Sequence, residues 1–137
     1  MLYNYKILPP YKVYISKSSV HGCGVFANEI IEEGEVIEET PLYDLGIKKG
    51  EITSLMIDYR FNWPQGAGGD WIKQVLAWGY GSLYNHSESP NAHWRSNIER
   101  ETFEFVANRK INKDEEILVW YGNISYWQDG RNHIVVK

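Results

Sequence analysis

Short runs in which apolar and polar residues alternate recur along the chain, separated by turn-forming residues. In residues 11–15 the apolar side chains of Val13 and Ile15 alternate with more polar neighbours. In residues 102–106 Phe103 and Phe105 lie on either side of a glutamate. Residues 36–37 form another such run directly after a glycine turn. Alternation over about four to eight residues is typical of β-strands with one buried face. These runs predict a mainly β protein.

Two other segments have less regular patterns. Residues 117–121 read Ile-Leu-Val-Trp-Tyr and are apolar throughout, which predicts a buried strand. Residues 51–63 fit either a helix or a strand, because Tyr59 and Phe61 also match a period of two. Pro64 would end either element.

The length and composition fit one soluble domain. The 137 residues are enough for one hydrophobic core, so the sequence predicts a single domain over residues 1–137. Aromatic residues reach 15%, with ten Tyr and six Trp, and this excess needs an explanation. Cys23 is the single cysteine, which excludes an internal disulfide and a cysteine-rich zinc cluster. The sequence therefore predicts no metal.

Charge and hydropathy narrow the classes of partner. The net charge of −4 argues against direct nucleic-acid binding and favours a basic partner. Residues 1–10 lack the apolar core of a signal peptide, and no run of about 18 apolar residues predicts a membrane span. We expect a soluble, intracellular protein that does not bind membranes. A homodimer is compatible with the sequence.

Three separate segments combine Gly, His, Asn and aromatic residues. Residues 21–27 read His-Gly-Cys-Gly-Val-Phe-Ala, residues 83–92 read Leu-Tyr-Asn-His-Ser-Glu-Ser-Pro-Asn-Ala, and residues 115–122 read Glu-Glu-Ile-Leu-Val-Trp-Tyr-Gly. Glycines let backbone amides approach a ligand closely. Each segment also has an ordinary structural interpretation: a hairpin turn, a polar loop with a buried histidine, and an aromatic core residue.

Taken together and in this order, the three segments resemble the SET-domain protein lysine methyltransferases. The shared patterns are His-Gly-x-Gly-x-Phe-Ala, Asn-His-Ser-x-x-Pro-Asn, and Glu-Glu-Ile/Leu followed by a terminal Tyr-Gly. The resemblance covers residues 12–127. The short chain without zinc-binding flanks is most similar to the minimal SET proteins of large DNA viruses.

This resemblance implies a SET fold of small curved sheets with a threaded C-terminal segment, and S-adenosylmethionine as the cofactor. It implies that Tyr121 is catalytic. The implied substrate-channel residues are Tyr59, Val119 and Tyr126. The implied cofactor-binding residues are His21, Gly22, Cys23, Gly24, Asn85, His86 and Trp127. The implied substrate is a lysine-bearing protein such as a histone.

The sequence departs from the family pattern at several positions. Trp120 stands where many members have Asp, and Ser82-Leu83-Tyr84 replaces the usual residues before Asn-His. No C-terminal cysteines complete a zinc site, so the C-terminal aromatic and apolar residues would have to close the adenine pocket.

The residue types suit methyl transfer to lysine. Near neutral pH about one lysine amine in a thousand is uncharged, a handicap of roughly 4 kcal/mol. An aromatic tunnel and a positively charged sulfonium both lower the lysine pKa. The tunnel also aligns the amine with the methyl group, and the hydroxyl of Tyr121 orients the amine lone pair.

An acidic stretch surrounds the predicted strand at residues 36–37. Residues 29–39 contain six glutamates in eleven residues. They fit either a solvated turn or a surface that attracts the basic residues around a target lysine. The second interpretation involves Glu32, Glu33, Glu35, Glu38 and Glu39.

Two other functions compete with methyl transfer. One is a non-catalytic module whose aromatic cage, formed by Tyr59, Tyr121 and Tyr126, binds lysine or methyl-lysine by cation-π contact. The other is a hydrolytic metalloenzyme that uses His21, His86 and His93, although their spacing matches no known ligand pattern.

Overall fold

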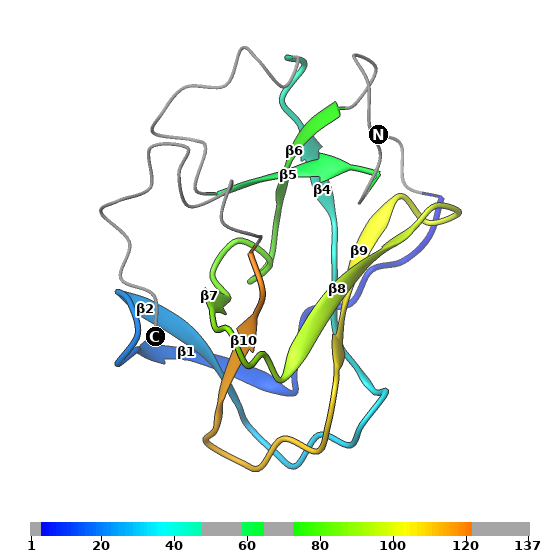
Figure 1. Cartoon of the computed structure of the whole chain (residues 1–137). Helices are drawn as coiled ribbons and strands as arrows, with labels where there is room; N and C mark the ends of the chain where they lie inside the picture. The colour runs from blue at the N-terminus through cyan, green and yellow to red at the C-terminus, as the bar shows by residue number, and fades with distance from the viewer. Residues whose placement is uncertain (1–3, 48–58, 65–72, 122–137) are drawn as a thin grey trace.

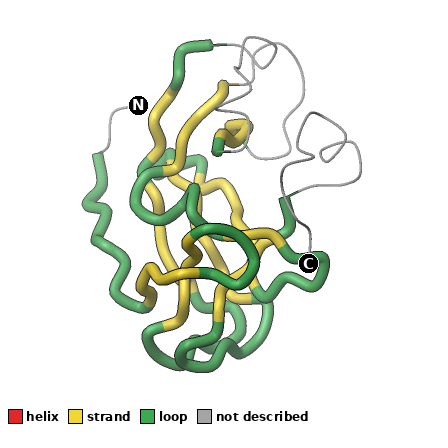
Figure 2. Tube along the Cα trace, turned by 90° about the vertical axis from the view of Figure 1, so that its left-hand side faces the viewer, coloured by secondary structure: helices red, strands yellow, loops and turns green. Residues whose placement is uncertain are grey.

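A computed structural model describes residues 4–47, 59–64 and 73–121 of the chain. Within these ranges the protein consists of strands and loops without a helix (Figures 1 and 2). The strands are β1 (Val13–Lys17), β2 (Cys23–Ala27), β3 (Val36–Thr40), β4 (Leu42–Asp44), β5 (Arg60–Trp63), β6 (Lys73–Ala77), β7 (Asn85–His86), β8 (Ala92–Asn97), β9 (Thr102–Ala107) and β10 (Glu116–Val119). The predicted fold of small sheets is confirmed for this part of the chain. In the same ranges no helix is long and apolar enough to cross a membrane.

The first sheet joins strands from both ends of the chain. Its order is β1-β2-β10-β7. β1 and β2 form an antiparallel hairpin, and β10 pairs antiparallel with β2 through Ile117 and Val25. On its other edge β10 pairs parallel with β7, where Val119 lies opposite His86. This sheet therefore brings the three motif segments together.

Two three-stranded sheets complete the described fold. One has the order β3-β9-β8 and the other β4-β6-β5 (Figure 1). Pairing in the first is antiparallel, with a β-bulge between Val36 and Glu38. A bulge adds one residue to a strand and locally disturbs the alternation of its side chains. Ile37 and Glu38 are both buried as a result.

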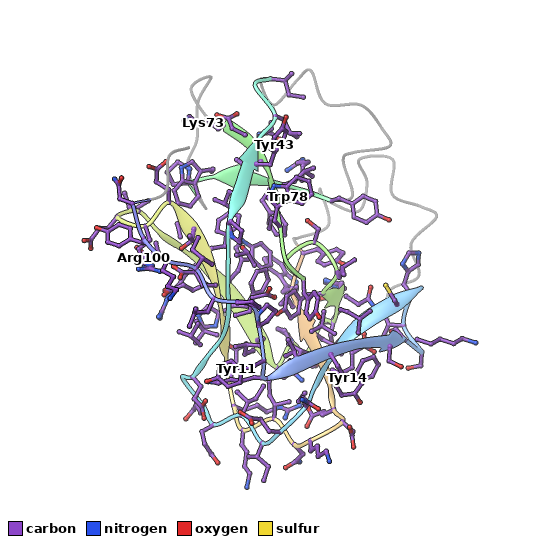
Figure 3. All side chains as sticks on the ribbon, turned by 180° about the vertical axis from the view of Figure 1, so that it is seen from behind. Tyr11, Tyr14, Tyr43, Lys73, Trp78 and Arg100 are labelled. Carbon is purple, nitrogen blue, oxygen red and sulfur yellow. The ribbon has the colours of Figure 1, made fainter. Side chains whose placement is uncertain are left out.

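Aromatic side chains fill much of the core between these sheets. Phe103 and Phe105 on β9 are fully buried, as predicted. The ring of Phe103 lies 5.2 Å from that of Phe61 and 5.5 Å from that of Trp63, both on β5. Edge-to-face and tilted pairs at such distances stabilise cores beyond simple area burial. Other aromatics, including Tyr11, Tyr43 and Trp78, are exposed at the periphery (Figure 3).

The predicted elements agree with the structure in part. Strands occur in residues 13–17, 36–40 and 102–107, close to the predicted runs. The prediction of a wholly buried 117–121 strand is wrong at its end, because β10 stops at Val119 and Trp120 is 45% exposed. Of the ambiguous segment 51–63, residues 60–63 form β5 and end at Pro64, while 51–58 lie outside the described residues. The predicted threaded C-terminal segment also lies outside them.

Candidate active site

The turn between β1 and β2 is closed by its own backbone. The amide of Ser18 donates to the carbonyl of Gly22 at 2.9 Å, and the Ser18 hydroxyl accepts from the amide of Val20 at 2.9 Å. Gly22 has a φ of +50°, a left-handed conformation that glycine adopts without strain. The conformation of the turn therefore explains why a glycine occupies this position of the motif. His21, Gly22 and Cys23 are all exposed.

Asn85 ties β7 to this turn. Its Nδ2 donates to the carbonyls of His21 at 3.0 Å and Cys23 at 3.1 Å, and lies 3.0 Å from Oε2 of Glu116. The side-chain amide of an asparagine has two hydrogens and one acceptor oxygen. Nδ2 is thus fully used by the protein, and Oδ1 has no hydrogen-bond partner among the described residues. Asn85 is 6% exposed.

Glu116 on β10 is the third member of this cluster, and no role follows for it from the sequence pattern alone. Its carboxylate accepts from the Ser18 hydroxyl at 2.8 Å in addition to its contact with Asn85. A side chain on Gly24 would collide with the Glu116 carboxylate, since Oε2 lies where a Cβ would project. The second glycine of the first motif is thus needed for the close approach of β2 to Glu116.

His86 places the backbone at the end of β10. Its Nδ1 accepts from the amide of Tyr121 at 2.9 Å, so the ring is the tautomer with its proton on Nε2. That Nε2 lies 3.1 Å from the Glu88 carboxylate, and the ring is 3% exposed. Both ring nitrogens are therefore engaged within the protein.

Tyr121 follows β10 and is half-buried against the core. Its hydroxyl donates to the main-chain carbonyl of Tyr84 at 2.6 Å. Its ring centroid is 5.3 Å from that of His86. Tyr121 is thus fixed at two points, through its amide by His86 and through its hydroxyl by the residue before Asn85.

Tyr84 is itself anchored by a buried carboxylate. Its hydroxyl donates to Oε1 of Glu38 at 2.6 Å, and the amide of Tyr80 donates to Oε2 at 3.0 Å. Burial raises the pKa of Glu38 to about 6, although both hydrogen bonds oppose the shift. Burial raises the pKa of Tyr84 well above its ordinary value of 10.0, and the charge of Glu38 adds to this effect. The Tyr84 hydroxyl therefore remains a donor.

Comparison with known protein families identifies the family of this chain. A model of the SET domain matches residues 22–122 of the chain. The chain belongs to the SET domain family. The match includes all three motif segments except His21, and it lies inside the predicted core of residues 12–127.

Two relatives of this SET domain have names that refer to histone methylation. The Schizosaccharomyces pombe protein named "Histone-lysine N-methyltransferase, H3 lysine-37 specific" is 31% identical over 112 residues, which cover 79% of this chain and 71% of that protein. A solved structure from Plasmodium falciparum, described as a histone methyltransferase, is 39% identical with a TM-score of 0.66. The alignment covers 82% of this chain and 94% of that one. Both relatives are eukaryotic and give no support to the predicted likeness to viral SET proteins.

The predicted channel residues of the SET domain are in different surroundings. Val119 is 2% exposed and belongs to the hydrophobic core. Tyr59 precedes β5 and is 48% exposed, and its carbonyl accepts from the Ser82 hydroxyl at 3.2 Å. Tyr126 and Trp127 lie outside the described residues. The assignment of these four side chains to a channel and an adenine pocket stays a prediction.

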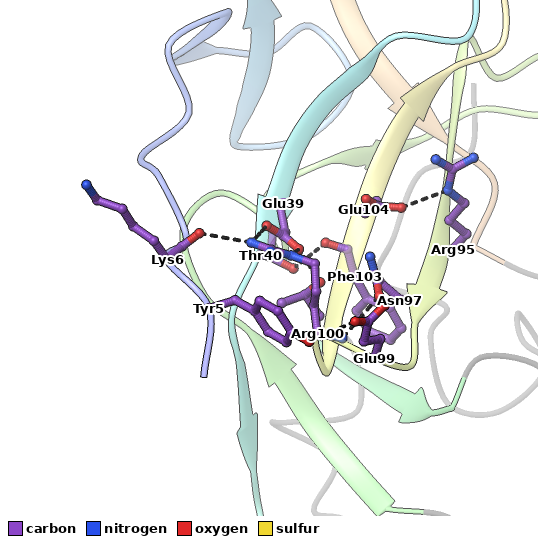
Figure 4. A network of polar contacts seen from close by, with 11 residues as sticks. Tyr5, Lys6, Glu39, Thr40, Arg95, Asn97, Glu99, Arg100, Phe103 and Glu104 are labelled. Carbon is purple, nitrogen blue, oxygen red and sulfur yellow. Dashed lines mark hydrogen bonds and ion pairs between the residues drawn. The ribbon is translucent and has the colours of Figure 1, made fainter. Parts of the chain in front are cut away.

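The interpretation of the acidic stretch as a steering surface is wrong for Glu38, and two more of its five glutamates are held in ion pairs. Glu38 is buried against Tyr84. Glu39 accepts from the Arg100 guanidinium at 2.6 and 2.8 Å (Figure 4), and this contact helps to lower the pKa of Glu39 against the opposing effect of burial. Glu35 is paired with the Lys12 amine at 2.6 Å. These three carboxylates make contacts within the fold. The other two glutamates of the proposed surface, Glu32 and Glu33, are exposed.

The three histidines in the described part of the SET domain, His21, His86 and His93, do not form a metal cluster. Within the described ranges no group of three or more His, Cys, Asp or Glu side chains is placed to hold a metal ion. His86 is engaged by Tyr121 and Glu88, and His93 by Asn108. This arrangement favours methyl transfer over the alternative of a metal-dependent hydrolase.

Proposed function

We propose that this protein lysine methyltransferase transfers a methyl group from S-adenosylmethionine to a histone lysine at a site centred on Tyr121. The observation that carries the proposal is the convergence of the three motif segments on one sheet. This convergence sets the Tyr121 hydroxyl against the carbonyl of Tyr84, one residue before the Asn85 cluster. The names of both relatives support a histone substrate.

The residues around the 21–23 turn fit the cofactor. Gly22 has open space where a side chain would project, and the turn is exposed. The free Oδ1 of Asn85 suits an ammonium donor such as the amino-acid end of the cofactor. Because both ring nitrogens of His86 are engaged, its main chain is the group that would contact the cofactor. Gly24, His21 and Cys23 complete the cradle, and Trp127 is proposed to cover the adenine.

Tyr121 acts on the lysine amine as a hydrogen-bond acceptor. Its own proton is directed to the Tyr84 carbonyl, so the hydroxyl oxygen would act toward an N–H of the substrate as an acceptor and not as a donor. Accepting this hydrogen bond orients the amine lone pair toward the methyl group. S-adenosylmethionine, when bound, supplies that methyl on a positively charged sulfur.

The environment of Tyr121 also favours the neutral amine. A half-buried site removes water from the lysine, and desolvation lowers the pKa of an ammonium. Tyr59 and Tyr126 are proposed as further aromatic walls of the lysine channel, with the small Val119 leaving room beside the amine. No side-chain base is needed under this scheme. Access to histones implies residence in the nucleus or cytoplasm.

The proposal is tested by incubating the protein with cofactor that carries an isotopically labelled methyl group and with histone H3 peptides. Peptides that span lysine 37 come first, because the fission yeast relative is named for that residue. We expect the label on a lysine side chain by mass spectrometry, and none on a matched peptide with arginine at that position. Peptide binding without transfer to any histone would contradict the proposal and favour the aromatic cage.

A further inference from the structure

Two hydrogen bonds connect Tyr121, through Tyr84, to the β3-β9-β8 sheet. The Tyr121 hydroxyl donates to the backbone of Tyr84, and the Tyr84 hydroxyl donates to Glu38, both at 2.6 Å. Glu38 lies on β3, Tyr84 directly precedes β7, and Tyr121 follows β10. Neither Glu38 nor the Tyr84 side chain is part of the three shared motif patterns.

The side chain of Tyr84 is held on its face as well as at its tip. Its ring stacks on Phe105 of β9 with centroids 4.3 Å apart and planes 15° apart. The residue is 2% exposed. Stacking alone leaves the ring free to slide in its plane, whereas the hydrogen bond to Glu38 fixes its position along β3. The main-chain carbonyl of Tyr84 is placed by the same residue.

Holding a tyrosine with the buried carboxylate of Glu38 costs stability. It is 4% exposed, and no described Lys, Arg or His forms an ion pair with it. A buried carboxylate without a cation costs stability, and two apolar side chains would pack here without that cost. Gly79 leaves room for it, since a Cβ there would lie 2.6 Å from Glu38 Oε2.

The groups that face Glu38 are few. The Tyr84 phenol and the Tyr80 amide contact it, and Phe105 lies opposite it on β9. The neighbouring charges on the same sheet belong to other side-chain pairs: Glu39 with Arg100, and Glu104 with Arg95. The carboxylate therefore acts on the Tyr84 ring and the Tyr80 turn rather than on another charge.

We propose that Glu38 is a positioning residue for methyl transfer, which fixes Tyr84 so that its carbonyl receives the hydroxyl of Tyr121 in the reactive orientation. The inference rests on the proposed catalytic role of Tyr121. A hydrogen bond to a carboxylate is roughly twice as strong as one between neutral groups, which suits the task of fixing a ring. Small misplacements at a reacting centre reduce rates strongly.

The test measures kcat for Tyr84→Phe in the full chain and again in a Tyr121→Phe background. Tyr84→Phe keeps the stacked ring and removes the hydroxyl bonded to Glu38. We expect kcat to fall by about 5- to 20-fold with the cofactor Kd and the peptide KM within about twofold. In the Tyr121→Phe background the same substitution should change kcat by less than about twofold, because the hydroxyl it positions is absent.

Thr102→Val is the matched control. Like Tyr84→Phe, it removes a hydroxyl that donates to a glutamate of β3. Here the acceptor is Glu39, at 2.7 Å, which pairs with Arg100 rather than with Tyr84. It should lower the melting temperature and leave kcat unchanged at a temperature where the protein is folded. A folded Tyr84→Phe with normal kcat, or an equal loss in both backgrounds, would overturn the inference.

Two outcomes are distinguished by the same data. If Tyr121→Phe alone turns over normally, the proposed role of Tyr121 fails; if it is slow while Tyr84→Phe is normal, the role of Glu38 alone fails. Should Tyr84→Phe not fold, Glu38→Gln replaces it in both backgrounds. The neutral amide accepts a weaker hydrogen bond from Tyr84 than the carboxylate does. We therefore expect kcat to fall by about two- to fourfold, again only when the Tyr121 hydroxyl is present. No loss with Glu38→Gln would also overturn the inference.

Discussion

The buried carboxylate of Glu38 should make the stability of the protein fall as the pH rises through its pKa. Its pKa of about 6 in the folded protein lies above the ordinary value of 4.5 because burial disfavours the charge. Between these values the folded state binds the proton more tightly than the unfolded state does. The stabilising effect of protonation is therefore fully present below about pH 4.5 and lost above about pH 6.

The size of this effect follows from the shift. The difference between 6 and 4.5 is about 1.5 pKa units. At about 1.4 kcal/mol per unit, ionised Glu38 lowers the free energy of unfolding by about 2 kcal/mol. Three other glutamates, Glu35, Glu39 and Glu115, have lowered pKa values and act in the opposite direction. Their contributions to the stability of the protein are lost as the pH falls.

Glu38→Gln isolates the contribution of this one group, since an amide does not ionise. We expect the variant to gain about 2 kcal/mol relative to the unmutated protein between pH 4.5 and pH 7.5, measured by urea unfolding at intermediate pH steps. Glu33→Gln, on an exposed side chain, removes the same charge and should not reproduce this trend. A stability difference between Glu38→Gln and the unmutated protein that stays constant across this pH range would refute the reasoning.

The remaining predictions concern the cofactor cradle and the product. Asn85→Ala should weaken S-adenosylhomocysteine binding by about 1 to 3 kcal/mol in isothermal titration, because it removes both the free Oδ1 and the amide that fixes the turn; unchanged affinity would remove Asn85 from the cradle. Gly24→Ala should reduce the same affinity at least as much, since the methyl group displaces the Glu116 carboxylate from Asn85, and normal binding would contradict that geometry. Val119 lies two residues before Tyr121, a position where resemblance to other SET enzymes implies a larger aromatic that restricts the channel. The smaller valine should leave room for repeated transfer, so we predict a di- or trimethylated lysine, which an endpoint assay stopping at monomethyl-lysine would disprove.

The sequence was sufficient to predict the fold class and the family. The structure explains both glycines of the first motif. Gly22 meets the φ of +50° at the turn, and Gly24 allows the close approach of Glu116. The core positions of Phe103 and Phe105 also follow from simple alternation.

The roles of the glutamates could not be predicted from local pattern. Strict alternation assigns Ile37 and Glu38 to opposite faces of a strand, and the bulge in β3 buries both. Glu116 faces Asn85 only because β10 pairs with β2 and β7, which is a long-range arrangement. Trp120 appeared buried by hydropathy, but the chain leaves the sheet after Val119.

The most direct test of the central claim is the turnover of Tyr121→Phe, with cofactor affinity and melting temperature measured on the same sample. The substitution keeps the ring beside His86 and removes the hydroxyl that contacts Tyr84. We predict that kcat falls by roughly 30- to 1000-fold, or about 2 to 4 kcal/mol, while S-adenosylhomocysteine binding stays nearly unchanged. A folded, cofactor-binding Tyr121→Phe that methylates lysine at the normal rate would contradict the account.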